Sequence, residues 1–241
     1  MKSLSILIPI YNEEESLQAL FDELKFSFEN NQSIEIIFIN DGSSDMSQKV
    51  IENEIANHST WKLINLYRNY GKSVALQSGI DIASNELIAT LDGDLQDDPK
   101  ELINLVRELN EDDVIVGWKK DRLDPLEKKI ASKIFNFFIK LFSGLKIKDS
   151  NSGIKVLKKE VAKSLNLYGG RHRYIPLLAH QKGFNVKEIP VNHRERKFGK
   201  SKYGAERYKH GFFDFMTILF LGKYMDRPLH FCGMVGFLSI L

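Results

Sequence analysis

The chain has 241 residues, of which 43% are hydrophobic and 27% are charged, a composition that excludes a disordered or fibrous protein. The net charge is only +2, but it is unevenly distributed. Residues 1–115 contain 8 Lys and Arg against 22 Asp and Glu (net −14), whereas residues 116–241 contain 26 against 10 (net +16). We therefore expect a site at which a cation and a polyanion meet, the alternative being a chance distribution of solvated surface charge.

Several functional classes lose support from missing motifs. The single cysteine, Cys232, excludes an intramolecular disulfide and a cysteine-based zinc site, and the six histidines show no metal-ligand spacing. Gly71-Lys72-Ser73 resembles the end of a P-loop, but Leu66 stands where that motif needs its first glycine. No G-x-G-x-x-G follows the first expected strand, and no G-x-S-x-G occurs. Dinucleotide oxidoreductases, P-loop NTPases and serine hydrolases are therefore disfavoured.

Short β-branched runs alternate with helical patterns along the first half of the chain. We expect strands at residues 4–10, 34–40, 62–66, 87–91 and 114–117, and helices at residues 14–29, 47–56, 73–83 and 99–109. This order predicts a single α/β domain with a mostly parallel sheet and helices on both faces. Beyond residue 117 we expect a lysine-rich helix at 126–142, a polar loop at 148–153, another helical region and a strand at 186–191.

The two ends of the chain differ in what they indicate about membranes. The start has one positive charge and too short an apolar run for a secretory signal, and it reads as the first strand. Residues 229–241 are almost purely apolar but shorter than the roughly 20 residues of a bilayer span. We expect the start of a transmembrane helix there, with a buried core segment as the alternative. Residues 206–228, rich in aromatic and basic side chains, are expected to form amphipathic juxtamembrane helices.

Polar clusters stand at the ends of the first four expected strands: residues 9–14, 40–45, 68–72 and 92–99. Each alone is ordinary turn chemistry, but four together at the carboxyl edge of a parallel sheet predict a ligand site. Asp92 and Asp94 end a strongly apolar strand, and two carboxylates held so close need a neutralising cation. Oxygen ligands suit Mg²⁺ or Mn²⁺, and Gln96 is a further candidate ligand.

The segments Pro9-Ile-Tyr-Asn-Glu-Glu14, Asn40-Asp-Gly-Ser-Ser-Asp45, Arg68-Asn-Tyr-Gly-Lys72 and Leu91-Asp-Gly-Asp-Leu-Gln-Asp-Asp-Pro99 resemble the successive motifs of family 2 glycosyltransferases, which have the Rossmann-like GT-A fold. The R-x-x-G-x-S-K-Y box at residues 196–203 resembles that of polyprenyl-phosphate glycosyltransferases, the group that includes dolichyl-phosphate mannose synthases. The resemblance spans nearly the whole chain. It implies a catalytic domain at 1–205, with a nucleotide-sugar and metal half (1–117) and an acceptor half (118–205), followed by 206–228 and 229–241 as described above.

The resemblance also implies roles for individual residues. The nucleotide-sugar would be bound by Pro9, Tyr11, Glu13, Asp41, Lys72 and Asp92, and the divalent cation by Asp92, Asp94 and Gln96. The acceptor and the phosphates would be bound by Lys119, Arg122, Lys133, Arg196, Ser201 and Lys202. The catalytic set would be Asp94, Asp149 and Arg196, with Asp149 either a general base or a group that orients a cation. Where relatives have Gly-Ser-Arg and a later second Arg, this chain has Gly117-Trp118-Lys119 and Lys133, so the charge remains but the bidentate geometry of arginine does not.

Together these features predict a metal-dependent, inverting transfer of a hexose from a nucleoside-diphosphate sugar to polyprenyl (undecaprenyl) phosphate, with Mg²⁺ or Mn²⁺ as cofactor. UDP-glucose is the preferred donor and GDP-mannose an alternative. The reaction is expected at the cytoplasmic face of the cytoplasmic membrane, with membrane lipid but no nucleic acid as a partner; a homo-oligomer is left open. The rival hypotheses are a family 2 enzyme with a soluble or glycan acceptor and a non-catalytic anion- or membrane-binding module.

Overall fold

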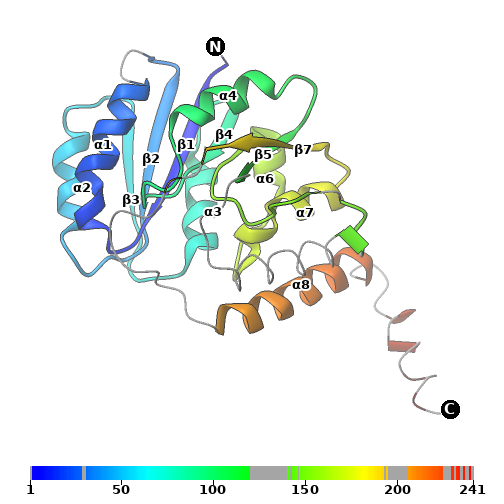
Figure 1. The fold of residues 1–241 in the computed structure, drawn as a ribbon. Coiled ribbons are helices and arrows are strands. Elements are labelled where there is room, and N and C mark those ends of the chain that lie inside the picture. Colours follow the sequence, from blue (N-terminus) through cyan, green and yellow to red (C-terminus); the bar gives the residue numbers. More distant parts are fainter. Residues whose placement is uncertain are drawn as a thin grey trace.

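The computed structural model describes residues 2–28, 31–119, 140–141, 143–145, 147–192, 194, 206–224, 229–230, 232–233, 236 and 239 (Figure 1). Its centre is a seven-stranded sheet in the order β3-β2-β1-β4-β6-β5-β7. The strands are β1 (Leu4–Ile10), β2 (Ile34–Asn40), β3 (Trp61–Asn65), β4 (Leu87–Thr90), β5 (Val114–Lys119), β6 (Lys155–Lys158) and β7 (Val186–Val191). All of them run parallel except β6, which pairs antiparallel with both β4 and β5.

Helices cover both faces of the sheet (Figure 1). One face packs against α1 (Glu14–Phe28), α2 (Ser47–Ile55) and α4 (Lys100–Glu108), and the other packs against α3 (Lys72–Ile82), α6 (Lys159–Ser164) and α7 (Ile175–Gln181). The two-residue period of β2 explains this division, because Ile36 and Phe38 join the first core and Ile37 and Ile39 join the second. Both faces are buried, as expected of a mostly parallel sheet.

A third core lies where the long helix α8 (Glu206–Tyr224) packs beside the short helix η1 (Arg171–Tyr174) and α7. Phe215 and Ile218 of α8 are buried against Tyr174, whose hydroxyl donates a hydrogen bond of 2.5 Å to the carbonyl of Gly211. Phe213, on another side of the helix, is 68% exposed. The aromatic residues of this segment are therefore divided between the core and the surface.

Most of the expected elements are observed with ends shifted by one or two residues. The exception is β6, because the sequence predicted a helical region after residue 153 and the structure has a strand at Lys155–Lys158. Four residues between two neighbouring strands are too short to show a period, and burial on both faces removes the alternation. The expected helix at 126–142 lies almost entirely outside the described residues, and the predicted domain boundaries remain a prediction.

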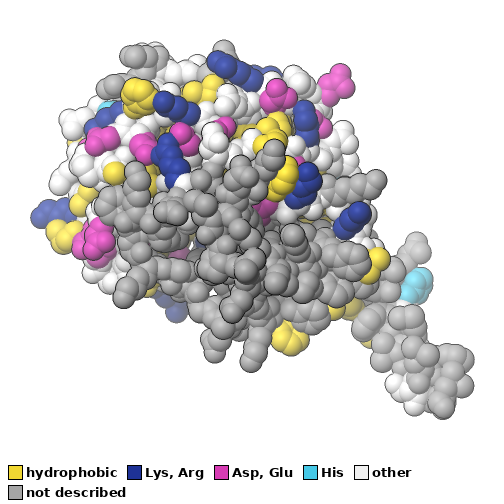
Figure 2. Space-filling view, viewed as in Figure 1, with side chains coloured by type: hydrophobic (Ala, Val, Ile, Leu, Met, Phe, Trp, Pro, Cys, Tyr) yellow, Lys and Arg dark blue, Asp and Glu magenta, His cyan; other side chains and the backbone are white. Residues whose placement is uncertain are grey.

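Among the described residues, no helix is long and apolar enough to span a bilayer. Most of the expected start of a transmembrane helix, residues 229–241, lies outside them, so that expectation stays a prediction. Lys and Arg side chains are interspersed with Asp and Glu over the described part of the face in Figure 2. Over this described part of the face, the two signs of charge are not separated.

Candidate active site

Hydrogen bonds join the four polar segments at the carboxyl edge of the sheet. The Asn12 amide donates to Ser43 Oγ at 3.0 Å, linking the segments after β1 and β2. The Asp41 carboxylate accepts from the amides of Tyr70 and Gly71 at 2.8 and 2.9 Å, linking β2 to the segment after β3. Lys72 Nζ then lies 2.5 Å from Asp92 Oδ1, linking that segment to β4. The predicted convergence is confirmed by this chain of contacts.

Asp41 is 4% exposed, and burial raises the pKa of its carboxyl group although the Tyr70 and Gly71 amides act in the opposite direction. Its predicted partner is a nucleotide, but in this structure its carboxylate holds the loop that carries Lys72. Gly42, with φ 67°, allows that loop to pass closely, since a Cβ would lie 2.3 Å from the carbonyl carbon of Arg68.

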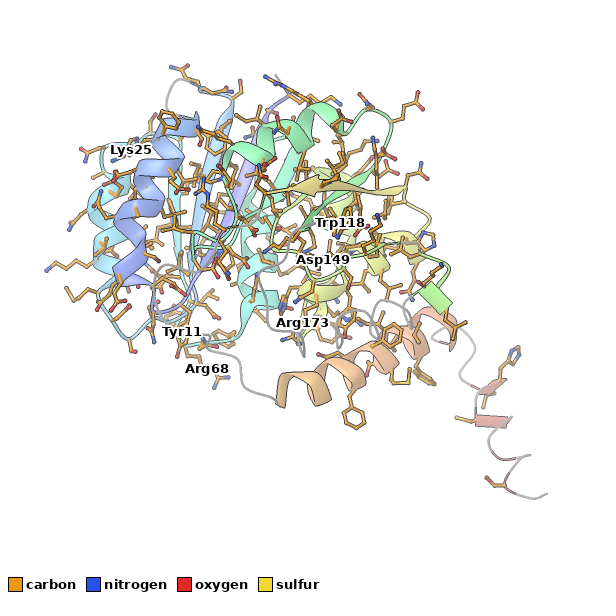
Figure 3. The ribbon with its side chains drawn as sticks, in the orientation of Figure 1. Tyr11, Lys25, Arg68, Trp118, Asp149 and Arg173 are labelled. Carbon is orange, nitrogen blue, oxygen red and sulfur yellow. The ribbon has the colours of Figure 1, made fainter. Side chains whose placement is uncertain are left out.

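The segment after β1 has a constrained backbone and an exposed aromatic ring. Asn12 has φ 52°, a conformation stabilised by its side-chain oxygen, which accepts from the Ser44 amide at 2.8 Å. Glu13 donates its amide to Ser47 Oγ at 2.9 Å. Tyr11 is 37% exposed, and Figure 3 shows it at the same end of the molecule as Arg68. The residues expected to bind the nucleotide, with Pro9 inside β1, thus lie along one edge.

Lys72 opens helix α3, and its ammonium group binds the first carboxylate of the Asp-x-Asp motif. Burial raises the pKa of Asp92, but the contact with Lys72 and the charges of Lys119 and Lys155 lower it more, so the net pKa is well below its usual value. Asp92 is therefore ionised at neutral pH. An ionised carboxylate supplies the negatively charged oxygen ligands that hard divalent cations prefer.

The rest of the motif lies on a tight loop. Asp94 Oδ1 accepts a hydrogen bond from the Gln96 amide at 3.2 Å, and Leu95 between them has φ 61°. Leu95 is 4% exposed, so its buried side chain holds this unfavourable conformation in place. Asp92, Asp94 and Gln96 are partly exposed and alternate with buried residues, so all three candidate metal ligands are on the accessible side of the loop.

A second set of carboxylates is buried beside this loop. Asp97 is 2% exposed, and its Oδ1 lies 2.9 Å from Lys119 Nζ at the end of β5. Asp149 is 1% exposed and comes from the loop before β6. Lys155, the first residue of β6, is 3% exposed, and its ammonium group donates to the carbonyl of Ser152. Burial and the charge of Lys72 lower the pKa of Lys155 to about 8, although Asp92, Asp149 and Asp97 oppose the shift.

Glycine at position 153 allows these groups to approach one another. A Cβ there would lie 2.6 Å from Asp92 Oδ2 and 2.8 Å from Asp97 Oδ2, so the two carboxylates occupy the space beside the Gly153 backbone. The Gly153 carbonyl accepts a hydrogen bond of 2.6 Å from Thr90 Oγ1. The loop before β6 is therefore fastened to the end of β4, directly below the Asp-x-Asp motif.

The same loop is anchored at its other end by Glu188 of β7. Its carboxylate accepts from the amides of Lys148, at 2.7 and 2.8 Å, and of Asp149, at 2.7 Å. Burial raises the pKa of Glu188, and these two amides act against the shift. Lys148 Nζ also lies 3.8 Å from the centre of the Trp118 ring, and Figure 3 shows Trp118 beside Asp149. Trp118 therefore contacts this loop.

The predicted acceptor residues are only partly covered by the structure. Arg122, Lys133, Arg196, Ser201 and Lys202 lie outside the described residues, and Lys119 is described. The chain is described up to Arg194, two residues before the R-x-x-G-x-S-K-Y box. The Arg194 amide donates to the Gln96 carbonyl at 2.9 Å, and its guanidinium group binds Asp98 at 2.5 Å. The described chain therefore approaches the Asp92–Asp98 loop just before the box.

Sequence reasoning missed Lys155, Asp97 as a buried group, Glu188 and His172. The His172 ring lies 2.9 Å from Ser73 Oγ, next to Lys72, and burial together with nearby positive charges holds its pKa well below the usual value. Asp97 had a signal in the sequence, namely its place in an acidic run. Lys155 and Glu188 had no such signal, because their roles depend on contacts with other strands and loops. Among the described residues, no three His, Cys, Asp or Glu side chains are arranged as a ready-made metal site.

A mostly parallel sheet whose carboxyl edge carries an Asp-x-Asp loop and the joined segments after β1, β2 and β3 defines a GT-A-type fold. Residues 5–165 match the Glycosyl transferase family 2 domain, and the chain belongs to that family. It is accordingly a glycosyltransferase, and the alternative of a non-catalytic anion-binding module is wrong.

Two curated relatives match almost the whole chain. Dodecaprenyl-phosphate galacturonate synthase of Rhizobium johnstonii is 35% identical over an alignment 240 residues long, which covers 97% of this chain and 71% of the relative. Undecaprenyl-phosphate 4-deoxy-4-formamido-L-arabinose transferase of Yersinia pestis is 35% identical over an alignment 241 residues long, which covers 98% of this chain and 72% of the relative.

Solved structures share the fold at low identity. Glucosyl-3-phosphoglycerate synthase from Mycobacterium tuberculosis, in complex with uridine diphosphate, has a TM-score of 0.68 at 15% identity, covering 92% of this chain and 80% of that one. The mannosyltransferase PcManGT from Pyrobaculum calidifontis, in complex with GDP-Man and Mn²⁺, has a TM-score of 0.64 at 15% identity, covering 86% of this chain and 60% of that one. At this identity the likeness establishes the fold alone.

Proposed function

We propose that the chain transfers a sugar from a nucleoside-diphosphate donor to a polyprenyl phosphate, with undecaprenyl phosphate as the expected acceptor. The observation that carries the proposal is the contact of Lys72 with Asp92, because it joins the segments after β3 and β4 at one edge of the sheet. Both curated relatives are named for sugar transfer to or from polyprenyl-phosphate carriers and cover nearly all of the chain, which supports this acceptor class.

The donor lies across the segments that follow β1, β2 and β3. Tyr11 and Asp41 bind the base and ribose, and Lys72, at the start of α3, binds the diphosphate, where the helix dipole adds positive potential. UDP-glucose is the preferred donor and GDP-mannose the alternative. The names of the relatives add galacturonate and 4-deoxy-4-formamido-L-arabinose as sugars to test.

The oxygen atoms of the Asp92–Gln96 loop fit a hard divalent cation, Mg²⁺ or Mn²⁺. Asp92 and Asp94 offer carboxylate oxygens and Gln96 an amide oxygen, all on the exposed side of one loop, and hard cations prefer oxygen ligands. When bound there, the cation supplies positive charge that stabilises the departing diphosphate. Lys72 shares this role, since its ammonium group can move from Asp92 to the phosphate oxygens.

The acceptor phosphate is the nucleophile. With a second pKa near 6, a phosphomonoester is largely dianionic at neutral pH and needs no base. Its oxygen attacks the anomeric carbon opposite the leaving group, so that a bond to the lipid phosphate forms, the bond to the nucleoside diphosphate breaks and the configuration inverts. Lys119 and the basic residues of the R-x-x-G-x-S-K-Y box neutralise and orient the acceptor. Asp149 is 1% exposed, which favours its role in orienting cations over that of a base.

We propose that the reaction occurs at the cytoplasmic face of the cytoplasmic membrane. The acceptor is a membrane lipid, and Phe213 and Met216, 68% and 37% exposed on α8, are apolar groups suited to a membrane interface. A flotation assay with vesicles that contain anionic lipids tests the membrane association on which this location depends.

The function is tested with the purified chain in detergent, undecaprenyl phosphate, Mg²⁺ or Mn²⁺ and a panel of radiolabelled nucleotide sugars headed by UDP-glucose. Label from one donor should enter the lipid fraction only when the lipid phosphate and the metal are present. Asp94→Ala should abolish transfer, whereas Asp22→Ala, a matched change at an exposed position of α1, should leave it intact. Label that enters a soluble glycan instead would establish the rival acceptor class, and full activity of Asp94→Ala would overturn the metal assignment.

A further inference from the structure

Lys155 is a buried cation at the centre of the candidate site. It begins β6, where it pairs with Thr90 of β4 and Val116 of β5. Thr90 lies two residues before Asp92, and Val116 three residues before Lys119. The neighbouring Val156 joins the core on the α1 side of the sheet, so the Lys155 side chain lies on the opposite face, which α3 covers. The antiparallel strand thus brings an ammonium group beneath the Asp-x-Asp loop.

The charges around Lys155 are nearly balanced. Asp92, Asp149 and Asp97 all act on its ammonium group, and Lys72 acts against them. Two of these carboxylates have further cationic partners, Asp92 with Lys72 and Asp97 with Lys119. Three carboxylates and three ammonium groups therefore share a site in which isolated charges are very costly to bury.

We propose that Lys155 is a positioning residue: its ammonium group is the fixed counter-ion of the Asp92, Asp97 and Asp149 carboxylates. It holds them in place while the cation on the exposed side of the loop changes from the Lys72 ammonium group to the metal ion. This inference rests on the proposed metal-dependent function. Lys72 lies at the helix start and is 21% exposed, so it can leave Asp92 when a donor arrives. Lys155 is buried and tied to the Ser152 carbonyl, so it stays.

The proposal predicts an unusual result for the neutral variant Lys155→Met. Methionine fills similar space, but the site loses one positive charge and no oxygen ligand. The carboxylates then attract a divalent cation more strongly, and Mn²⁺ should bind about tenfold tighter without nucleotide. The apo protein should melt at a lower temperature, and Mn²⁺ should restore much of the loss. If Lys155 only filled space in the core, Lys155→Met would lower the stability equally with and without metal and would leave the Mn²⁺ affinity unchanged.

The experiment measures Mn²⁺ binding by electron paramagnetic resonance and melting with and without Mn²⁺. Lys158→Met, on the same strand, is the matched control, because it removes an ion pair with Asp113 that lies apart from the site. It should lose the same stability in both conditions and bind Mn²⁺ like the wild type. If the wild type binds Mn²⁺ and Lys155→Met binds it equally or more weakly, this inference alone is overturned. If the wild type binds no Mn²⁺, the proposed metal site is overturned as well.

A charge-compensated variant covers the case in which Lys155→Met does not fold. Lys155→Met combined with Asp97→Asn removes one charge of each sign from the site. Under the proposal this double variant folds, because the charge balance is restored. If it remains unfolded, Lys155 acts through packing and the proposal is wrong.

Discussion

Gly153→Ala tests the geometry of the site with one added methyl group. The new Cβ would lie 2.6 Å from Asp92 Oδ2, 2.7 Å from Asp92 Cγ and 2.8 Å from Asp97 Oδ2, where ordinary contacts begin at 3.4 Å. Each carboxylate, or the loop itself, must therefore move by more than half an ångström. The carboxylates are not free to yield, because Asp92 is paired with Lys72 at 2.5 Å and Asp97 with Lys119 at 2.9 Å.

Overpacking of this kind costs about 1–3 kcal/mol of unfolding free energy. Part of the cost is offset, because alanine restricts the unfolded chain and stabilises by about 0.4–1 kcal/mol where the backbone permits it, and Gly153 does not have a positive φ. We expect a net loss of about 1–2 kcal/mol. Sugar transfer should fall more steeply, by about 100-fold, since displacement of a catalytic group by a fraction of an ångström to one ångström has effects of this order.

The assay is chemical denaturation together with initial rates at saturating Mn²⁺ and donor. Gly211→Ala is the matched control, because its Cβ would meet the Tyr174 hydroxyl at an ordinary 3.8 Å and it lies inside α8. That variant should be as active as the wild type and slightly more stable, as alanine is favoured over glycine in helices. If Gly153→Ala keeps its transfer rate within about threefold, the close approach of the two carboxylates is not needed for activity, and the reasoning fails.

Three further predictions concern two contacts at the site and one ion pair apart from it. Glu188→Ala should lower kcat about tenfold with little change in donor KM, because the amides that fix Asp149 lose their acceptor; unchanged steady-state kinetics would refute this anchoring. Lys72→Met should weaken UDP binding about tenfold, measured as the Kd by calorimetry, and equal UDP affinity would contradict its phosphate role. Hydrogen bonding from Lys158 lowers the pKa of Asp113, so this stabilisation is present above the ordinary carboxyl pKa and is lost as the pH falls through the lower folded-state pKa. Asp113→Asn should therefore cost about 1 kcal/mol in urea melts at pH 7 and nothing in strong acid, and a cost independent of pH would disprove the linkage.

Much of the fold followed from local patterns. The strand at Ile34–Asn40 was predicted at its observed bounds, because a run of apolar β-branched residues ending in a polar turn is a local signal. The Asp92-x-Asp94 motif was found for the same reason, since both carboxylates follow an apolar strand. The short strand β6 was missed, because its state is decided by β4 and β5 on either side rather than by its four residues.

By itself, the sequence determined the alternation of strands and helices, the four polar segments at one edge and the family to which they belong. Only the tertiary structure decided that Lys155 and Asp97 are buried together, that Glu188 holds the loop of Asp149 and that position 153 has no room for a side chain. The physical reason is that periodicity and turn chemistry depend on neighbours along the chain. Burial, charge balance and close approach depend instead on residues that are distant in sequence and meet only when the sheet has formed.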